Sequence, residues 1–139
     1  MATRSRPKLL RAAFISAALL LSAQSTLAQF TQQGPKLVGT LAVGPAYQGT
    51  SVALSGDGST AIVGAPHDSG NIGAALVWIR SGAAWTQQAK LAGDDGAGES
   101  YQGQHVALSS DGNTAIVGGY NDGSAAGGAA WVYTRNNGA

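Results

Sequence analysis

The stretch GTSVALSGDGSTAIVGA, residues 49–65, returns as GQHVALSSDGNTAIVGG, residues 103–119. Twelve of the seventeen positions are identical, which marks an internal duplication. In the first copy Val52 and Leu54 alternate with small residues, a period of two that is typical of a half-buried strand. Asp57-Gly58 then supplies a turn, and a consecutive apolar run follows, as in a strand that is covered on both faces. Each copy therefore predicts a β-hairpin.

The duplication extends beyond the hairpin. FTQQGPKLVG (30–39) matches WTQQAKLAG (85–93), and GAALVWIR (73–80) matches GAAWVYTR (128–135), which gives a period of 54–55 residues. A period of this size is typical of propellers, solenoids and arrays. A β-solenoid is the alternative, but its coils are usually shorter and rarely show such meander turns.

Each repeat predicts four short strands, with an apolar inner pair and a polar outermost strand, which is the pattern of a propeller blade. The fold class is therefore all-β, with β-propeller blades of four-stranded antiparallel sheets. Repeat 1 covers about 30–84 and repeat 2 about 85–139, within a mature segment 29–139. The expected strands of the first blade lie at 52–55, 61–64, 75–80 and 85–91, and 30–38 is expected to be a spare fourth strand.

Two blades are too few for a ring, because propellers contain roughly four to eight. The sequence thus predicts either further blades in the same chain or a homo-oligomer of several chains. Of the two, we favour a piece of a longer protein.

Residues 1–28 resemble a secretory signal peptide, with basic residues first, an apolar run at 12–21 and small residues before a cleavage point after Ala28. A membrane anchor is the alternative, but the apolar run is half the roughly 20 residues that a spanning helix needs. We therefore expect a secreted, periplasmic or cell-surface protein without membrane insertion after cleavage.

The remaining chain is mildly acidic and has no cysteine. It carries four basic residues against seven acids, a net charge of −3, so it lacks the basic surface that nucleic-acid binding needs. No disulfide can staple the domain, and its core must hold it together.

The repeats also resemble a known family. Gln48–Ala53 stands at the place of an FG-x-S-V opening, and Val63–Pro66 at the place of a V-G-A-P close. The chain is similar to the FG-GAP repeat family, the blades of the integrin α-subunit propeller, and looks most like its bacterial exported branch. Both copies lack the Phe, and the second lacks the Pro. The resemblance implies a β-propeller that binds a protein or glycan ligand in recognition or adhesion.

Some blades of this family carry a calcium loop, D-x-D-x-D-G-x-x-D. Only Asp57 in the first copy and Asp111 in the second remain of its carboxylates, whereas calcium takes six to eight oxygen ligands. We expect both to form turns, and we expect no cofactor. A weaker calcium candidate is the acidic connection between the blades, with Asp94, Asp95 and Glu99, for which a solvated loop is the favoured interpretation.

Polar loops on a rigid scaffold are where ligand binding is usually found. The loop after the second strand and the connection between blades emerge on the same rim, where Tyr47 and Glu99 also lie. The candidate ligand-binding residues there are His67, Asp68, Asn71, Tyr101, Asn121 and Asp122. The alternative is that Asp68 and Asp122 merely hydrogen-bond their own loop backbone.

The chain carries no recognisable catalytic apparatus. His67 and His105 do not correspond in the two repeats, and no nucleophile motif such as G-x-S-x-G is present. We therefore expect no enzyme, but an exported recognition or adhesion protein or fragment. The alternative is a structural scaffold without activity of its own. A lectin-like or enzymatic propeller built from several chains is a third hypothesis.

Overall fold

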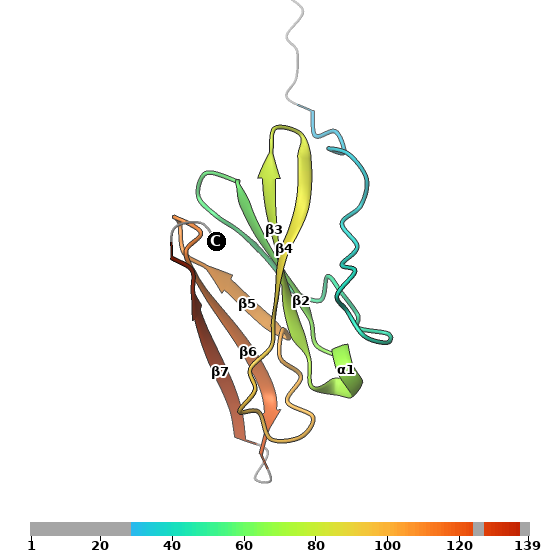
Figure 1. Ribbon diagram of the computed structural model, residues 1–139, viewed down its shortest axis with the longest axis vertical. Coiled ribbons are helices and arrows are strands. Elements are labelled where there is room, and N and C mark those ends of the chain that lie inside the picture. The colour runs from blue at the N-terminus through green and yellow to red at the C-terminus, as the bar shows by residue number, and fades with distance from the viewer. Residues whose placement is uncertain (1–28, 124–126, 137–139) are drawn as a thin grey trace, which may run out of the picture. The chain divides into compact units, whose positions relative to one another are not determined.

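A computed structural model describes residues 29–123 and 127–136, which form two antiparallel sheets (Figure 1). The first sheet contains β1 (Val52–Leu54), β2 (Thr60–Ala65), β3 (Ala74–Ser81) and β4 (Ala84–Leu91), hydrogen-bonded in chain order. The second contains β5 (His105–Leu108), β6 (Thr114–Asp122) and β7 (Gly127–Thr134) in the same order. The all-β prediction is confirmed, and both sheets are consistent with partial propeller blades.

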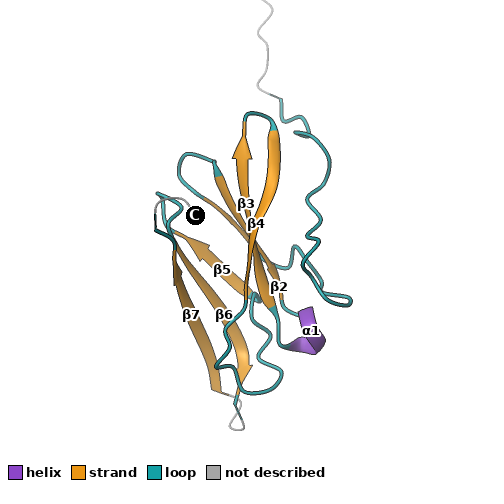
Figure 2. Cartoon of the chain, in the orientation of Figure 1, coloured by secondary structure: helices purple, strands orange, loops and turns teal. Residues whose placement is uncertain are grey.

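The helix α1 (Asp68–Asn71) is the only helix in the described part of the chain (Figure 2). It is an irregular turn, because Ser69 and Gly70 have φ values of 52° and 69°, in the left-handed region. The sequence predicts a polar loop there. Left-handed angles do not belong to a regular right-handed helix, and the turn is only four residues long. The sequence therefore has no helical periodicity there from which the turn could be predicted.

The Asp-Gly hairpin closes with a loop in which the Ser55 N–H donates to the Thr60 carbonyl (2.9 Å). Gly58 has a φ of 68°, which a residue without a Cβ adopts without strain. The Asp57 carboxylate accepts bonds from the Ser55 hydroxyl (2.6 Å) and the Ser59 N–H (2.9 Å). The second copy repeats these contacts with Ser109, Asp111 and Asn113.

The outermost pair of the first sheet contains a β-bulge. Val77 is opposite Ala89 and Trp78 is opposite Gln87, so Gln88 is an extra residue on β4. A bulge bends one strand and leaves one residue outside the regular ladder.

The core lies between the two sheets. Its buried side chains are Ile62, Ala75 and Val77 of the first sheet and Ala115 and Val117 of the second. One apolar face of each sheet packs against the other sheet, so the core requires both blades.

Glycines allow the backbones of the two blades to touch. A side chain at Gly64 would collide with the carbonyl oxygen of Gly103, which also accepts a bond from the Ser51 hydroxyl (2.8 Å). Nearby, the Tyr101 N–H donates to the Asn71 carbonyl at 2.9 Å. The loop of the first blade is thereby fixed to the chain entering the second.

The expected strand at 30–38 does not form. Residues 29–38 are not in a strand, and 32–38 make no backbone–backbone hydrogen bond with any described residue. The edge of β3 that a fourth strand of the first blade would use is already occupied by β4. The predicted signal peptide, 1–28, lies outside the described residues. Among those described, no helix has the length and hydrophobicity to cross a membrane.

Candidate ligand-binding rim

Four rings contact one another in sequence along the rim, and we call them the aromatic row: Tyr47, His67, Tyr101 and Tyr120. The centroids of Tyr47 and His67 lie 4.5 Å apart, with the rings tilted. Those of His67 and Tyr101 lie 5.4 Å apart edge to face, and Tyr101 stacks on Tyr120 at 4.8 Å. Tyr47 and Tyr120 are 65% and 56% exposed, so both ends of the row face solvent.

The repeat explains this placement. Tyr47 and Tyr101 are equivalent residues at the ends of the connections that enter each blade, and both have left-handed φ values, 52° and 54°. Such angles cost about 1 kcal/mol or more in a non-glycine residue. The same left-handed angle thus occurs in both copies, and each tyrosine contacts a ring of its own repeat, Tyr47 that of His67 and Tyr101 that of Tyr120.

Two of the predicted residues, His67 and Tyr101, are in the row, and Asn71 lies beside it. His67 Nδ1 and Asn71 Oδ1 are 2.7 Å apart, and His67 contacts the ring of Tyr101. The Tyr101 hydroxyl donates to the Glu99 carboxylate at 3.2 Å, and Asn121 Nδ2 donates to the Glu99 carbonyl at 3.0 Å. The pKa of Tyr101 is raised, first by desolvation and then by the Glu99 carboxylate.

Asp68 and Asp122 support the connections between blades. Asp68 is fully buried, accepts the Val43 N–H at 3.1 Å and pairs with Lys90 Nζ at 2.7 Å. Asp122 likewise accepts the Ala97 N–H at 2.7 Å. Both aspartates therefore accept hydrogen bonds from backbone N–H groups, as the alternative interpretation has it. The donors, however, belong to the connection that enters each blade and not to the aspartate's own loop. A role for them in ligand binding stays a prediction.

Sequence reasoning missed Tyr120 as a site residue. Tyr120 follows Val117-Gly118-Gly119 and occupies the position of Pro66 in the first copy. This replacement of the family's proline by a tyrosine is the sequence feature that could have indicated a site residue. Tyr47 was placed on the rim but not in the site, because an isolated tyrosine gives no sign of a stacked neighbour.

The acidic residues do not gather into a metal site. The described ranges contain no group of three histidine, aspartate or glutamate side chains placed to hold a cation. Of the calcium candidates, Asp95 accepts a bond from Trp131 Nε1 at 2.7 Å, Glu99 serves Tyr101, and Asp94 is exposed. Asp57 and Asp111 use their carboxylates in the hairpin turns, as expected.

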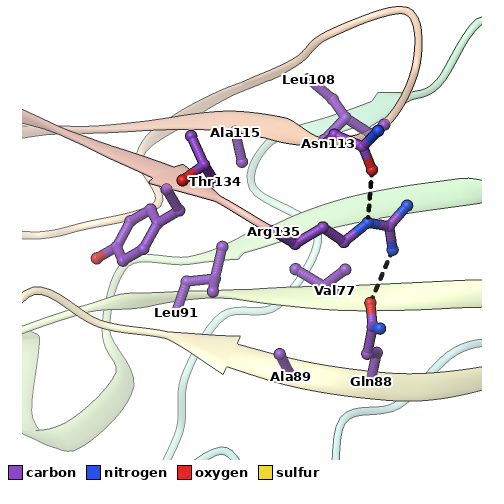
Figure 3. A pocket seen from close by; sticks show the side chains of 11 residues that line it. Val77, Gln88, Ala89, Leu91, Leu108, Asn113, Ala115, Thr134 and Arg135 are labelled. Carbon is purple, nitrogen blue, oxygen red and sulfur yellow. Dashed lines mark hydrogen bonds between the residues drawn. The ribbon is translucent and has the colours of Figure 1, made fainter. Parts of the chain in front are cut away.

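A hollow of about 240 Å³ lies between the two sheets (Figure 3). Its walls are mainly apolar and include Val77, Leu91 and Leu108. Arg135 lies at its edge and donates to Gln88 Oε1 (2.9 Å) and Asn113 Oδ1 (3.1 Å), as Figure 3 shows. Arg135 therefore ties the last strand of the first blade to the hairpin turn of the second. This hollow belongs to the packing between blades.

Sheet order, blade-to-blade packing and loops on a shared rim define a protein segment of the β-propeller type. The family model described as FG-GAP repeat matches residues 85–133, so this part of the chain is similar to an FG-GAP repeat. This match begins with β4 and ends in β7, and so includes one connection between blades. No curated protein matches the chain significantly.

Proposed function

We propose that the chain is an exported, non-enzymatic recognition module whose ligand binds along the aromatic row. One observation carries this proposal: four rings from two repeats make an unbroken series of contacts and end in exposed tyrosines. Tyrosine offers a large amphipathic contact area that loses little side-chain entropy on binding. A rigid row of this kind suits recognition.

The chemistry of the rim favours a glycan as the ligand. Apolar faces of sugar rings pack on aromatic rings, and sugar hydroxyls need nearby donors and acceptors. The Glu99 carboxylate and the Asn71 and Asn121 amides provide such groups beside the row. A protein ligand is the other class that the family resemblance implies, and the experiment below separates the two.

The proposal includes two further points, that the protein catalyses no reaction and that it is exported. His67 Nδ1 lies 2.7 Å from Asn71 Oδ1, and His105 lies on β5 with an exposed side chain, so neither imidazole hydrogen-bonds a serine hydroxyl or a second histidine in the described ranges. The pattern of residues 1–28 supports export.

A printed glycan array tests the proposal. We expect the purified chain to bind a subset of the glycans, and Tyr120→Ala to weaken that binding at least about tenfold, as for an aromatic residue that anchors a ligand. Val132→Ala is the matched control, since Val132 is similarly exposed but lies on β7, outside the aromatic row. Binding that survives Tyr120→Ala, or binding only to arrayed proteins or peptides, would contradict the glycan proposal.

A further inference from the structure

We propose that Tyr101 and Tyr120 form a modification site, at which one-electron oxidation joins the two rings by a carbon–carbon bond. The oxidant is hydrogen peroxide acting through a peroxidase, which removes electrons from phenols one at a time. The product is a dityrosine crosslink within the chain. The inference concerns the reactivity of the two phenols and does not depend on the identity of a ligand.

The two rings are aligned for coupling. Their centroids lie 4.8 Å apart and their planes differ by 19°, so the face of one ring lies on the face of the other. The pKa of Tyr101 is raised first by desolvation, then by Glu99, and also by the Tyr120 hydroxyl, which places the two hydroxyls on the same side of the stack. The ring carbons beside each hydroxyl therefore lie close together. Those ortho carbons carry much of the unpaired spin of a tyrosyl radical.

Tyr101 has a proton acceptor within reach. Its hydroxyl donates to the Glu99 carboxylate at 3.2 Å. A phenol is easier to oxidise when its proton leaves together with the electron, because the radical cation is a strong acid. Glu99 takes the proton of Tyr101, and Tyr120, which is 56% exposed, gives its proton to water.

The coupling step balances with one molecule of peroxide. Each phenol loses one electron and its hydroxyl proton, and the two tyrosyl radicals combine through one ortho carbon of each ring. Each of these carbons then releases its hydrogen as a proton while the ring oxygen takes up a proton, so both hydroxyl groups are restored. Two hydrogen atoms leave in total. The peroxide accepts these two electrons and two protons and becomes two molecules of water.

The backbone already holds the two tyrosines together. The Gly103 N–H donates to the Gly118 carbonyl at 3.1 Å, and Tyr101 and Tyr120 lie directly beyond this contact, at the open end of the hairpin formed by β5 and β6. A covalent bond there closes the hairpin as a disulfide would, in a chain that has no cysteine. Such crosslinks stabilise a fold mainly by restricting the unfolded chain.

The first blade offers no such pair among the described residues. Tyr47 is the equivalent of Tyr101 and is 65% exposed, but Pro66 stands where the second blade has Tyr120. The ring that Tyr47 contacts is that of His67, which also contacts Tyr101 and so lies between the two tyrosines. Tyr47 is therefore a similarly exposed tyrosine without a stacked phenol, and it serves as the comparison.

Treatment of the purified chain with hydrogen peroxide and a haem peroxidase tests the site. We expect the intact monomer to lose the mass of two hydrogen atoms and to gain dityrosine fluorescence. After digestion on the amino side of aspartate, which cuts at Asp111, the peptides that carry Tyr101 and Tyr120 should remain joined.

Tyr120→Phe should abolish this product, because phenylalanine keeps the stacked ring but has no hydroxyl proton to lose. Tyr47→Phe is the matched control and should leave the yield unchanged. The absence of a link within the chain, or an equal yield with Tyr120→Phe, would overturn the proposal.

Thermal melting of the crosslinked monomer tests whether the pair is aligned in the folded chain. The crosslinked chain should melt about 5 °C or more above the untreated chain, as for a disulfide that closes a hairpin of similar length. Tyr120→Phe, treated in the same way, controls for other oxidation and should show no increase. A crosslinked chain that melts at or below the temperature of the untreated chain would mean that the bond distorts the fold, and would overturn the assignment of this pair as an aligned site.

Discussion

The two blades are built from nearly the same hairpin, yet equivalent apolar side chains are buried in the first blade and exposed in the second. Ile62 and Val77 of the first blade are almost completely buried, and they pack against Val117 and Ala115 of the second. Ile116 and Val132 have the same places in the second blade but face solvent. Burial here is decided by the neighbouring blade and not by the strand itself.

The same difference extends to the backbone. Gly64 of β2 touches the connection that enters the second blade, whereas its counterpart Gly118 has no such neighbour among the described residues. Repeat proteins gain much of their stability at the interfaces between units. Equivalent substitutions in the two blades should therefore have unequal effects, and each difference measures the contribution of one interface.

The largest effect is expected for Gly64→Val. Its side chain would collide with the Gly103 carbonyl oxygen and the Ser51 hydroxyl, so the blades would have to separate. We expect a loss of more than about 4 kcal/mol in the free energy of unfolding, or failure to fold. Gly118→Val should cost less than about 1 kcal/mol, because the nearest atoms, both of His105, lie 3.7 Å from the added Cβ. Urea denaturation of both variants measures the difference, and equal losses would mean that the close approach of the blades does not occur.

The next effect is expected for Ile62→Ala. Truncating this fully buried side chain leaves a cavity between the sheets and should cost about 3 kcal/mol. Ile116→Ala should cost under about 1 kcal/mol in the isolated chain, because nearly half of that side chain is already exposed. Denaturant midpoints compare the two. A large loss for Ile116→Ala at high protein concentration only would indicate that a second copy covers it.

The strands of both blades could be predicted from the sequence because their signals are local. Alternation at Val52 and Leu54, the Asp57-Gly58 turn and the repeat period need no knowledge of the partner sheet. The strand expected at 30–38 does not form for the converse reason. Its sequence has the pattern of a fourth strand, but a fourth strand pairs with a third strand, and β3 already pairs with β2 and β4.

The candidate site could be predicted only in part. The polar loop residues His67, Asn71 and Tyr101 do meet on the rim, because repeated loops leave a blade on the same side. Asp68 was indistinguishable from a ligand-binding aspartate, since its salt bridge to Lys90 spans 22 residues. The stack of Tyr120 on Tyr101 depends on a left-handed angle at Tyr101, which its sequence does not reveal.

A smaller difference is expected between Asp68→Asn and Asp122→Asn. Both amides can still accept the N–H of the incoming connection, but Asp68→Asn also leaves Lys90 without its buried partner. Its cost should be about 2 kcal/mol, below that of a fully buried ion pair because the Lys90 side chain is 20% exposed. Asp122→Asn should cost less than half of this in monomeric chain. Thermal melts under the same conditions test the order, and a reversed order would place the stronger ion pair in the second blade.

The smallest effect on stability should appear in acid, at the equivalent hairpin turns of the two blades. Hydrogen bonds from Ser55 and then Ser59 lower the pKa of Asp57 from 3.8 to about 2. Because the folded pKa lies below the unfolded value, the ionised carboxylate stabilises the fold above about pH 3.8, and this contribution is lost as the pH falls through about 2. Asp57→Asn should therefore flatten the dependence of the melting temperature on pH in that window.

Asp111→Asn is the matched comparison, since hydrogen bonds from Ser109 and Asn113 also lower the pKa of Asp111. Its turn lies beside the Arg135 side chain, which ties that hairpin to the first blade through Gln88 and Thr60. We expect the second turn to keep its geometry in acid through this additional support, so that Asp111→Asn changes the acid slope less than Asp57→Asn. An equal change in the two variants would show that each turn depends on its own carboxylate alone and gains nothing from contact between the blades.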